Sequence, residues 1–552
     1  MVLLRSVLEV VADDSRGKFH QTIFRSFYTI YRYKQWLGII TFVWLSAGCG
    51  STAITANNDL AAQANTEGSL LTEEAATTTN IPGATSTPSS TATPTSTPSP
   101  TPTLEPMPIP AMIGPPYVYH TVLPGETLGY LAWQYETTIE ELVAMNNLEG
   151  PTAIIQADQS LRVPVEIEST APPNPLFPDS EVVYGPSYVD FDIAAFVTEQ
   201  GGYLATYEQY VDNQPLNGAQ IVERVAEQFS VGPRVLLALV EYYSGWVTNP
   251  EPAAWDLNHP VGPQNPRGSD LYRALGFTAN RINAGYYAYK RDGFWIFQLA
   301  DRSRAITTSG LNAGTVGIQN ILALHSEEDT WATALSNEGF MATYKKFFGD
   351  PFAKAIEPLI PINLTQPSLA LPWREGQGFY FTGGPHPGYI DGSAWAAIDF
   401  GPPDVLGNCF YSAEPNTAVA DGIIASARQG EVMLDLDGDG HIQTGWVLLY
   451  LHMALDVDRP VQTGQHVKEG DVIGYASCEG GLSNSSHLHF ARRYNGEWLD
   501  AGGPVPLALS GWIVQPTLNP YSGTMTNGLD IREPCECWEP DMNLIIRQRT
   551  ED

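Results

Sequence analysis

Apolar and polar residues follow distinct patterns along this chain of 552 residues, and each pattern predicts a different kind of segment. Residues 117–165 combine short extended runs with short helical ones. Residues 188–360 carry apolar side chains at helical spacing. Residues 366–520 contain short apolar runs separated by glycine and proline, which indicates antiparallel strands. Because the chain is too long for one hydrophobic core, we expect a multidomain protein with a small mixed module, a mainly helical middle domain and a β-rich antiparallel domain.

Composition narrows the functional classes. A hydrophobic content of 43% and an aromatic content of 11% are globular values, so most of the chain should fold. The formal net charge of −33 would repel nucleic acid rather than hold it. We therefore expect no nucleic-acid partner.

The first 49 residues have the layout of an export signal. Basic residues precede an apolar run from Trp36 to Leu45, and small residues follow it, ending at Cys49. This layout resembles the lipobox of bacterial lipoproteins, which implies that Cys49 is lipidated and that the protein lies on the extracellular side of the membrane, in the cell envelope. The apolar run is short for a permanent transmembrane span. An ordinary signal peptide with an incidental cysteine is the alternative.

Residues 50–112 lack the apolar side chains that a core needs, and their second half is dominated by Ser, Thr and Pro. Proline-rich segments of this kind are extended and semi-rigid. We interpret the segment as a stalk between the membrane and the folded modules, an interpretation that overlaps with a disordered linker.

Residues 117–165 predict a β-α-α-β unit. An extended start meets a turn at Pro124-Gly125, Thr127 caps one helix, and Thr138 with Glu141 forms a capping box for the next. The order of these features resembles a LysM module, a family that binds N-acetylglucosamine-containing glycans such as peptidoglycan. The resemblance implies that sugar lies near the loop Gly125, Glu126, Thr127 and Leu128. A module that has kept the fold and lost sugar affinity is the alternative.

The middle domain shows the helical period most clearly in one run, Ile221, Val225, Phe229, Val235, Leu236, Leu239 and Val240. This stretch weakly resembles the opening helices of lysozyme-like transglycosylases. That family has a catalytic Glu directly before Ser-Gly, where this chain has Tyr243. Without a carboxylic acid the glycosidic oxygen would not be protonated, so we expect a non-catalytic spacer or binding domain.

Histidines in recognisable settings gather in residues 366–520. The apolar run 447–453 ends near His452, and a glycine-rich stretch leads to His487-Leu488-His489-Phe490, in which the two histidines share one strand face. This order resembles the lysostaphin-type zinc metallopeptidases, which cleave peptides in peptidoglycan. Where many members have a first His ligand, this chain has Trp395, but His386 and Asp399 match the β-lytic branch.

The resemblance implies a Zn²⁺ site with His386, Asp399 and His489 as ligands, which leaves the fourth position open as catalytic zinc requires. Asp391 is an alternative acidic ligand. His452 and His487 would transfer protons or stabilise the oxyanion. The expected function is that of a cell-wall zinc endopeptidase, with peptidoglycan and, through the lipid anchor, the membrane as partners. A non-catalytic peptidoglycan-binding protein that recruits another hydrolase is the alternative.

Asp435, Asp437 and Asp439 match the start of a calcium loop, but the twelfth position is Trp446 rather than Glu. Ca²⁺ binding and a plain hairpin turn are both open interpretations.

Four cysteines follow Cys49 in the chain. An even number in an exported protein suggests disulfides, and Cys409 with Cys478 is the first choice because both lie inside the β-rich domain. Cys535 and Cys537 fall in residues 521–552, which we expect to form a C-terminal tail.

Overall fold

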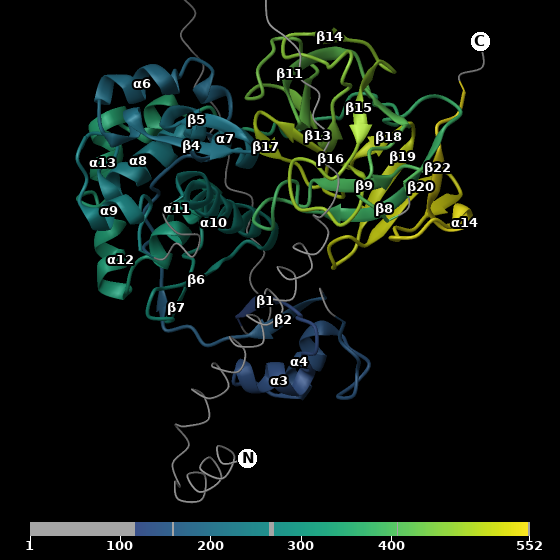
Figure 1. Cartoon of the computed structure of the whole chain (residues 1–552). Helices are drawn as coiled ribbons and strands as arrows, with labels where there is room; N and C mark the ends of the chain where they lie inside the picture. Colours follow the sequence, from purple (N-terminus) through teal and green to yellow (C-terminus); the bar gives the residue numbers. More distant parts are fainter. Residues whose placement is uncertain (1–115, 157–158, 264–269, 406, 550–552) are drawn as a thin grey trace, which may run out of the picture. The chain divides into compact units, whose positions relative to one another are not determined.

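The computed structural model describes residues 116–549 except 157–158, 264–269 and 406 (Figure 1). The expected export signal with Cys49 and the stalk therefore lie outside the described residues. Among the helices that are described, none is long and apolar enough to cross a membrane.

The predicted β-α-α-β unit is confirmed. Its elements are β1 (Tyr117–Thr121), α3 (Leu128–Gln134), α4 (Ile139–Asn146) and β2 (Ser160–Pro164). Strand β1 pairs antiparallel with β2. Thr127 caps α3, and Thr138 and Glu141 form the capping box of α4. Leu131, Leu142 and Val163 fill a small core between the helices and the strand pair.

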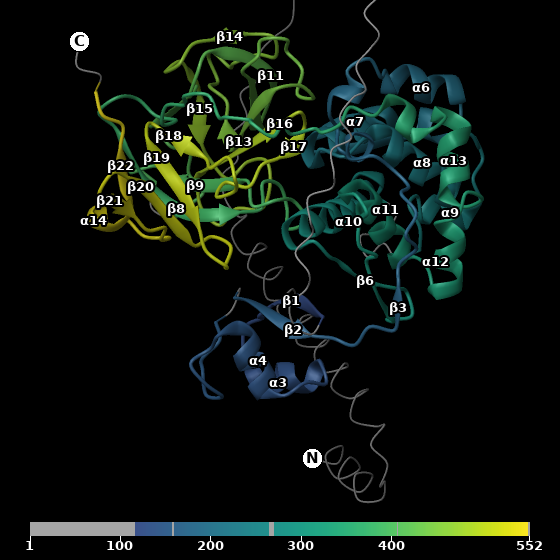
Figure 2. The same cartoon turned by 180° about the vertical axis from the view of Figure 1, so that it is seen from behind.

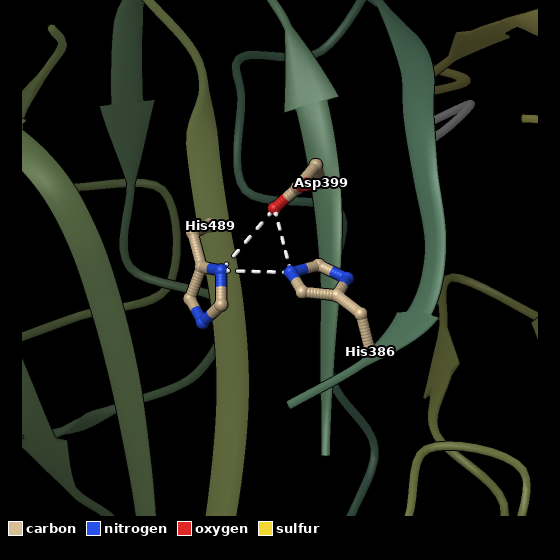
Figure 3. Close-up of side chains that lie close together, drawn as sticks. All are labelled: His386, Asp399 and His489. Atoms are coloured by element: carbon tan, nitrogen blue, oxygen red, sulfur yellow. Dashed lines mark hydrogen bonds and ion pairs between the residues drawn. The ribbon is translucent and has the colours of Figure 1, made fainter. Parts of the chain in front are cut away.

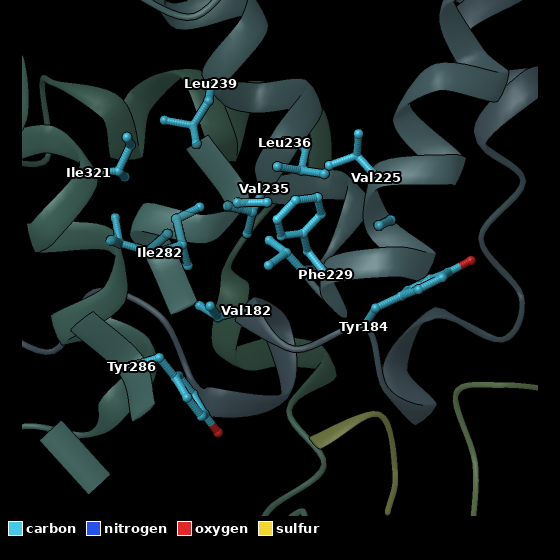
Figure 4. Packing of buried hydrophobic residues seen from close by; sticks show 14 of the residues in the cluster. Val182, Tyr184, Val225, Phe229, Val235, Leu236, Leu239, Ile282, Tyr286 and Ile321 are labelled. Atoms are coloured by element: carbon cyan, nitrogen blue, oxygen red, sulfur yellow. The ribbon is translucent and has the colours of Figure 1, made fainter. Parts of the chain in front are cut away.

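The middle domain is mainly helical, as predicted. Its helices of seven residues or more are α6 (Ile193–Gln200), α7 (Gly218–Phe229), α8 (Pro233–Ser244), α10 (Leu271–Asp292), α11 (Ala313–Leu324), α12 (Glu328–Ala334) and α13 (Phe340–Phe348). Shorter elements are α5 (Asp179–Val182), α9 (Ala254–Asn258), β3 (Ser169–Thr170), β4 (Glu208–Val211), β5 (Gln214–Asn217), β6 (Ile296–Gln298) and β7 (Arg304–Ile306). Figure 4 shows the apolar side chains of α7, α8, α10 and α11 meeting in one core.

The β-rich domain is built on one antiparallel sheet. Its main path runs β14 (His466–Val467), β11 (Gly422–Arg428), β12 (Gly430–Asp435), β13 (Trp446–Ala454), β16 (Leu488–Tyr494), β9 (Ala397–Gly401), β8 (Gly378–His386) and β22 (Leu544–Ile546). Strands β10 (Pro415–Thr417), β15 (Val472–Ala476) and β17 (Glu497–Trp498) pair beside this path. A smaller sheet contains β18 (Ala508–Leu509), β19 (Trp512–Pro516), β20 (Gly523–Asn527) and β21 (Asp530–Arg532).

Both faces of the large sheet are buried, because the strands alternate between two cores. Phe400, Leu448 and Phe490 belong to a core inside the β-rich domain. Ala397, Leu449 and Ala491 point the other way and join the core of the helical domain. The site residues on these strands share the second face, which the helical domain covers.

The described part of the expected tail, residues 521–549, is not separate from the β-rich domain, which corrects the expected boundary. Strand β20 extends the small sheet, and β22 pairs with β8 at the edge of the large one (Figure 2). Ile545 is fully buried in the core of the β-rich domain. The short apolar run of β22 forms the edge strand of the large sheet. Its partner, β8, lies more than 150 residues earlier in the chain.

Candidate active site

Strand pairing brings three ligand-type side chains together. His489 in β16 lies directly opposite Asp399 in β9, and His386 ends the neighbouring strand β8. His386 Nε2 is 2.9 Å from His489 Nδ1, and each of these nitrogens is 3.3 Å from Asp399 Oδ1 (Figure 3). Gly383 faces Asp399 across the strands, and a Cβ at this position would lie 2.5 Å from Asp399 Oδ2. A glycine is therefore needed to make room for the carboxylate.

The spacing and the hydrogen bonds fit a metal ion. His386 Nδ1 donates to the carbonyl of Gly384 at 2.8 Å, and His489 Nε2 donates to the carbonyl of Gly388 at 2.9 Å. In neutral rings the two facing nitrogens then both carry lone pairs, so they cannot hydrogen-bond to each other. A cation between them removes the conflict, and tetrahedral zinc with Zn–N bonds of about 2.0–2.1 Å separates its ligand atoms by about 3.3 Å.

The carboxylate adds negative charge at the same point. Asp399 is buried, and among the described residues its Oδ1 has no hydrogen-bond donor. Burial alone would raise the pKa of Asp399, but positive charge on His386 and His487 in their protonated forms holds that pKa well below its usual range. With neutral rings, a bound cation would supply that positive charge instead. An ionised, buried oxygen without a hydrogen bond, facing two nitrogen lone pairs, is a donor set that suits a divalent cation.

His452 reaches the same site through a bulge in β13. The pairing of β12 with β13 skips His452, whose φ of +61° is left-handed. In a regular strand, alternate side chains lie on opposite faces of the sheet. A bulge interrupts this alternation, so the His452 side chain lies on the face that regular alternation would not give it. Its Nδ1 donates to the carbonyl of Glu479 at 2.9 Å, and its Nε2 keeps a lone pair. Burial, with His487 and His489 nearby, lowers the pKa of His452 to about 3, so the ring is neutral near pH 7.

His487 stands beside His452 at the mouth of the site. The two ring centroids are 4.5 Å apart. His487 Nδ1 lies 2.8 Å from the carbonyl of Ser485, to which it donates, and its Nε2 is 3.6 Å from Asp399 Oδ1. The alternation of His487 and His489 thus places both rings on one face, as their spacing predicts.

These side chains line a cleft of about 1510 Å³. One face of α10 forms part of its wall, through Ala284, Tyr287, Ala288 and Arg291. Tyr521 also lines the cleft and stacks on His386 with ring centroids 4.3 Å apart. Sequence reasoning missed both contributions, because the helix and the turn that carries Tyr521 show no pattern that points to the histidines.

Other candidate residues lie elsewhere or are engaged in structural contacts. Asp391 is exposed and accepts a hydrogen bond from Asn280, away from the three ligand-type side chains. In the helical domain, Glu241 accepts hydrogen bonds from Thr248, which gives this carboxylate a structural role. Asp391 therefore does not compete with Asp399 for the site, and Glu241, the carboxylate two residues before Tyr243, is held by structural contacts.

The loop with Asp435, Asp437 and Asp439 gives no support for calcium. The carboxylates lie close enough to share an ion, but two of them are occupied by hydrogen bonds. Asp435 accepts from the backbone of Asp437, Gly438 and Gly440. Asp439 accepts from His441 N and Thr444 Oγ1. The acidic side chains therefore stabilise the turn that joins β12 to β13, because they accept its backbone and side-chain hydrogen bonds.

In the small module, the loop expected to contact sugar has few free side chains. Leu128 is buried in the core, so its side chain is not exposed to a ligand. Glu126 pairs with His120 at 2.7 Å, and Thr127 caps α3. Gly125 is exposed, so backbone groups of this loop remain available to a ligand.

The structure joins Cys409 to Cys478, and Cys535 to Cys537. The first pair connects two loops beside His452, since Cys478 directly precedes Glu479, whose carbonyl accepts from His452 Nδ1. Ser486 strengthens this connection by donating to the carbonyls of Asn408 and Phe410.

Family models match three segments of the chain. Residues 120–164 match the LysM domain, residues 175–363 match the N-terminal domain of LasA, and residues 410–501 match peptidase family M23. The M23 match includes His452, His487 and His489 and begins after Asp399. The lysozyme-like resemblance of the helical domain receives no support from these matches.

Two curated relatives are both named Protease LasA, from Pseudomonas aeruginosa strains UCBPP-PA14 and PAO1. They are 25% identical over 345 and 342 residues, which is 59% of this chain and 75% of each relative. Similar solved structures include the M23 metalloprotease pseudoalterin from the deep sea (20% identity, 31% of this chain and 96% of that chain, TM-score 0.26). Another is lysostaphin from Staphylococcus simulans (24% identity, 29% of this chain and 66% of that chain, TM-score 0.18).

The matched segments and the fold agree domain by domain. The β-α-α-β unit is a LysM domain, and the helical domain is a LasA N-terminal domain. The chain therefore combines a LysM domain, a domain like the N-terminal domain of LasA and a segment that matches peptidase family M23.

Proposed function

We propose that this protein is a zinc endopeptidase that hydrolyses peptide bonds in peptidoglycan and that its LysM domain holds it on the wall. The single observation that carries the proposal is the buried group of His386, Asp399 and His489, whose donor atoms converge on one point. These residues would hold the zinc ion. When bound, zinc supplies Lewis-acid chemistry, which polarises the scissile carbonyl and makes an attacking water more acidic.

The chain's own residues supply the remaining steps. Neutral His452 offers its Nε2 lone pair as a proton acceptor for the attacking water. His487 flanks the same side of the site and shares proton transfer and charge stabilisation with His452. The cleft has a volume of about 1510 Å³, which is large enough to take a peptide. A non-catalytic recruiting protein would need neither the three ligand-type residues close together nor the two further histidines beside them. The site has all five: His386, Asp399, His489, His452 and His487.

The function is tested by incubating the full chain with purified peptidoglycan. We expect new free amino groups and no new reducing sugar ends, because the cleaved bond is a peptide. A zinc chelator should stop the release, and added Zn²⁺ should restore it. If the protein binds the wall and releases nothing with zinc present, the recruiting protein becomes the better account.

The LysM domain is expected to act in binding and not in chemistry. Removing residues 116–168 should reduce co-sedimentation with insoluble peptidoglycan and leave hydrolysis of a small soluble peptide unchanged. We place the protein in the cell envelope, anchored through Cys49. Replacement Cys49→Ala should shift it from the membrane fraction to the soluble one, and equal partitioning would contradict the anchor.

A further inference from the structure

The segment between the two ligands of β8 and β9 is held by the helical domain. Residues 387–396 connect β8, which ends at His386, to β9, which carries Asp399, and they contact α10 through Asn280. Both polar atoms of the Asn280 side-chain amide, in α10, form hydrogen bonds with this segment. Its Nδ2 donates to Asp391 Oδ1 at 2.7 Å, and its Oδ1 accepts from the backbone N–H of Gly392 at 2.9 Å.

The contact is too close for any other residue at position 392. A Cβ on Gly392 would lie 2.2 Å from the backbone oxygen of Asn280 and 2.6 Å from its Oδ1. The neighbouring Ile390 has a φ of +56°, a conformation that a β-branched residue keeps only where its surroundings enforce it. Helix and segment are therefore fitted to each other at this point.

Hydrogen bonds within the segment connect the Asn280 contact to the candidate metal site. Ser393 donates its hydroxyl to the carbonyl of Ile390 and accepts from the N–H of Tyr389, both at 2.9 Å. Gly388 N donates to the carbonyl of Ala394 at 2.9 Å. The carbonyl of Gly388 in turn receives the Nε2–H of His489, the bond that aims His489 Nδ1 at the metal position.

We propose that Asn280, in the helical domain, is a positioning residue for the metal centre of the peptidase domain. It fixes the segment whose ends carry two ligands and whose Gly388 carbonyl orients the third. The proposal rests on the proposed function, because it concerns the geometry of the same zinc site. It assigns the LasA-type domain a direct part in the peptidase, beyond that of a spacer.

The test compares zinc affinity and visible spectra in the full chain. Asn280→Asp keeps the acceptor for Gly392 but sets a second carboxylate against Asp391. We expect the zinc Kd, measured by chelator competition, to rise up to about 10-fold, the lower end of the loss seen when a direct partner of a ligand is removed, because Asn280 acts through the segment and not on a ligand itself. The spectrum of the Co²⁺-substituted protein should change as well. The double variant Asn280→Asp/Asp391→Asn exchanges amide and carboxylate and should restore both readouts.

Asn283 provides a matched control on the same helix. Its Nδ2 donates to the carbonyl of Phe229, inside the helical domain. Asn283→Ala should lower the melting temperature and leave the zinc Kd and the Co²⁺ spectrum unchanged. If Asn280→Asp does not fold, Asn280→Ala removes both bonds, the one to Asp391 and the one from Gly392, without adding charge.

The proposal is overturned if the Asn280 variants lose stability but keep the parent's zinc Kd and spectrum, or if Asn283→Ala changes these readouts equally. A parent chain that binds no zinc would instead refute the proposed function and, with it, this inference.

Discussion

Backbone carbonyls hold the histidines of the site through one ring nitrogen each and leave the other nitrogen free to act. Because a carbonyl only accepts hydrogen bonds, it fixes which nitrogen carries the proton. In His386 and His489 the free lone pairs face each other and Asp399 Oδ1, whereas the His452 ring lies 6.0 Å from the His489 ring, measured between ring centroids.

Replacing His452 should therefore separate metal binding from turnover. In His452→Ala we expect the zinc content of the parent and a kcat lower by about 10²- to 10⁴-fold, the usual contribution of a positioned acid or base. The matched control is His466→Ala, since His466 is exposed on β14. Metal analysis and peptide hydrolysis measure the two effects. Loss of zinc from His452→Ala would show that His452 is a ligand and would contradict its assigned role.

At the scale of elements, strand register decides which residues meet. The alternation in His487-Leu488-His489 is local, so the shared face of the two rings could be predicted from the sequence. The pairing of His489 with Asp399 and the bulge at His452 both depend on neighbouring strands. Neither feature could be predicted from the residue pattern of one strand alone. The proximity of His386 to this pair was anticipated only through the family resemblance.

The acidic loop between β12 and β13 gives a prediction about pH. Partial desolvation and the nearby carboxylates of Asp435 and Asp439 raise the pKa of Asp437, a residue exposed in the loop, to about 7. A raised pKa means that the folded state binds a proton more tightly than the unfolded chain, so stability falls as pH rises from about 4 to about 7. Asp437→Asn should reduce this fall, as measured by melting temperatures at pH 5 and pH 8. A large rise in the parent's melting temperature on adding Ca²⁺ would instead make the loop a cation site.

At the scale of the whole molecule, the helical and β-rich domains share a buried boundary. Arg493 of β16 is buried and donates to the carbonyls of Glu227 and Gln228 in α7. Lys290 of α10 pairs with the buried Glu497. The three domains could be predicted from hydrophobic periodicity, but this boundary could not, because each partner is an ordinary polar residue in its own segment.

We therefore expect the helical and β-rich domains to unfold together. Calorimetry of the intact chain should show one transition for both, with the LysM domain free to unfold separately. Lys290→Met leaves the Glu497 carboxylate buried without its cation and should lower the free energy of the shared transition by about 1–3 kcal/mol. Arg273→Met, an exposed change on the same helix, serves as the control. Separate transitions for the two domains would contradict a shared unit.

The most direct test of the account is the zinc content of the full chain with and without His386. Elemental analysis should find about one zinc per chain in the parent and in His466→Ala, since three protein ligands complete a catalytic site. His386→Ala leaves two protein ligands and should lose both the zinc and all peptidase activity. A parent that folds without zinc, or a His386→Ala variant that keeps its zinc and its rate, would contradict the assignment of this site.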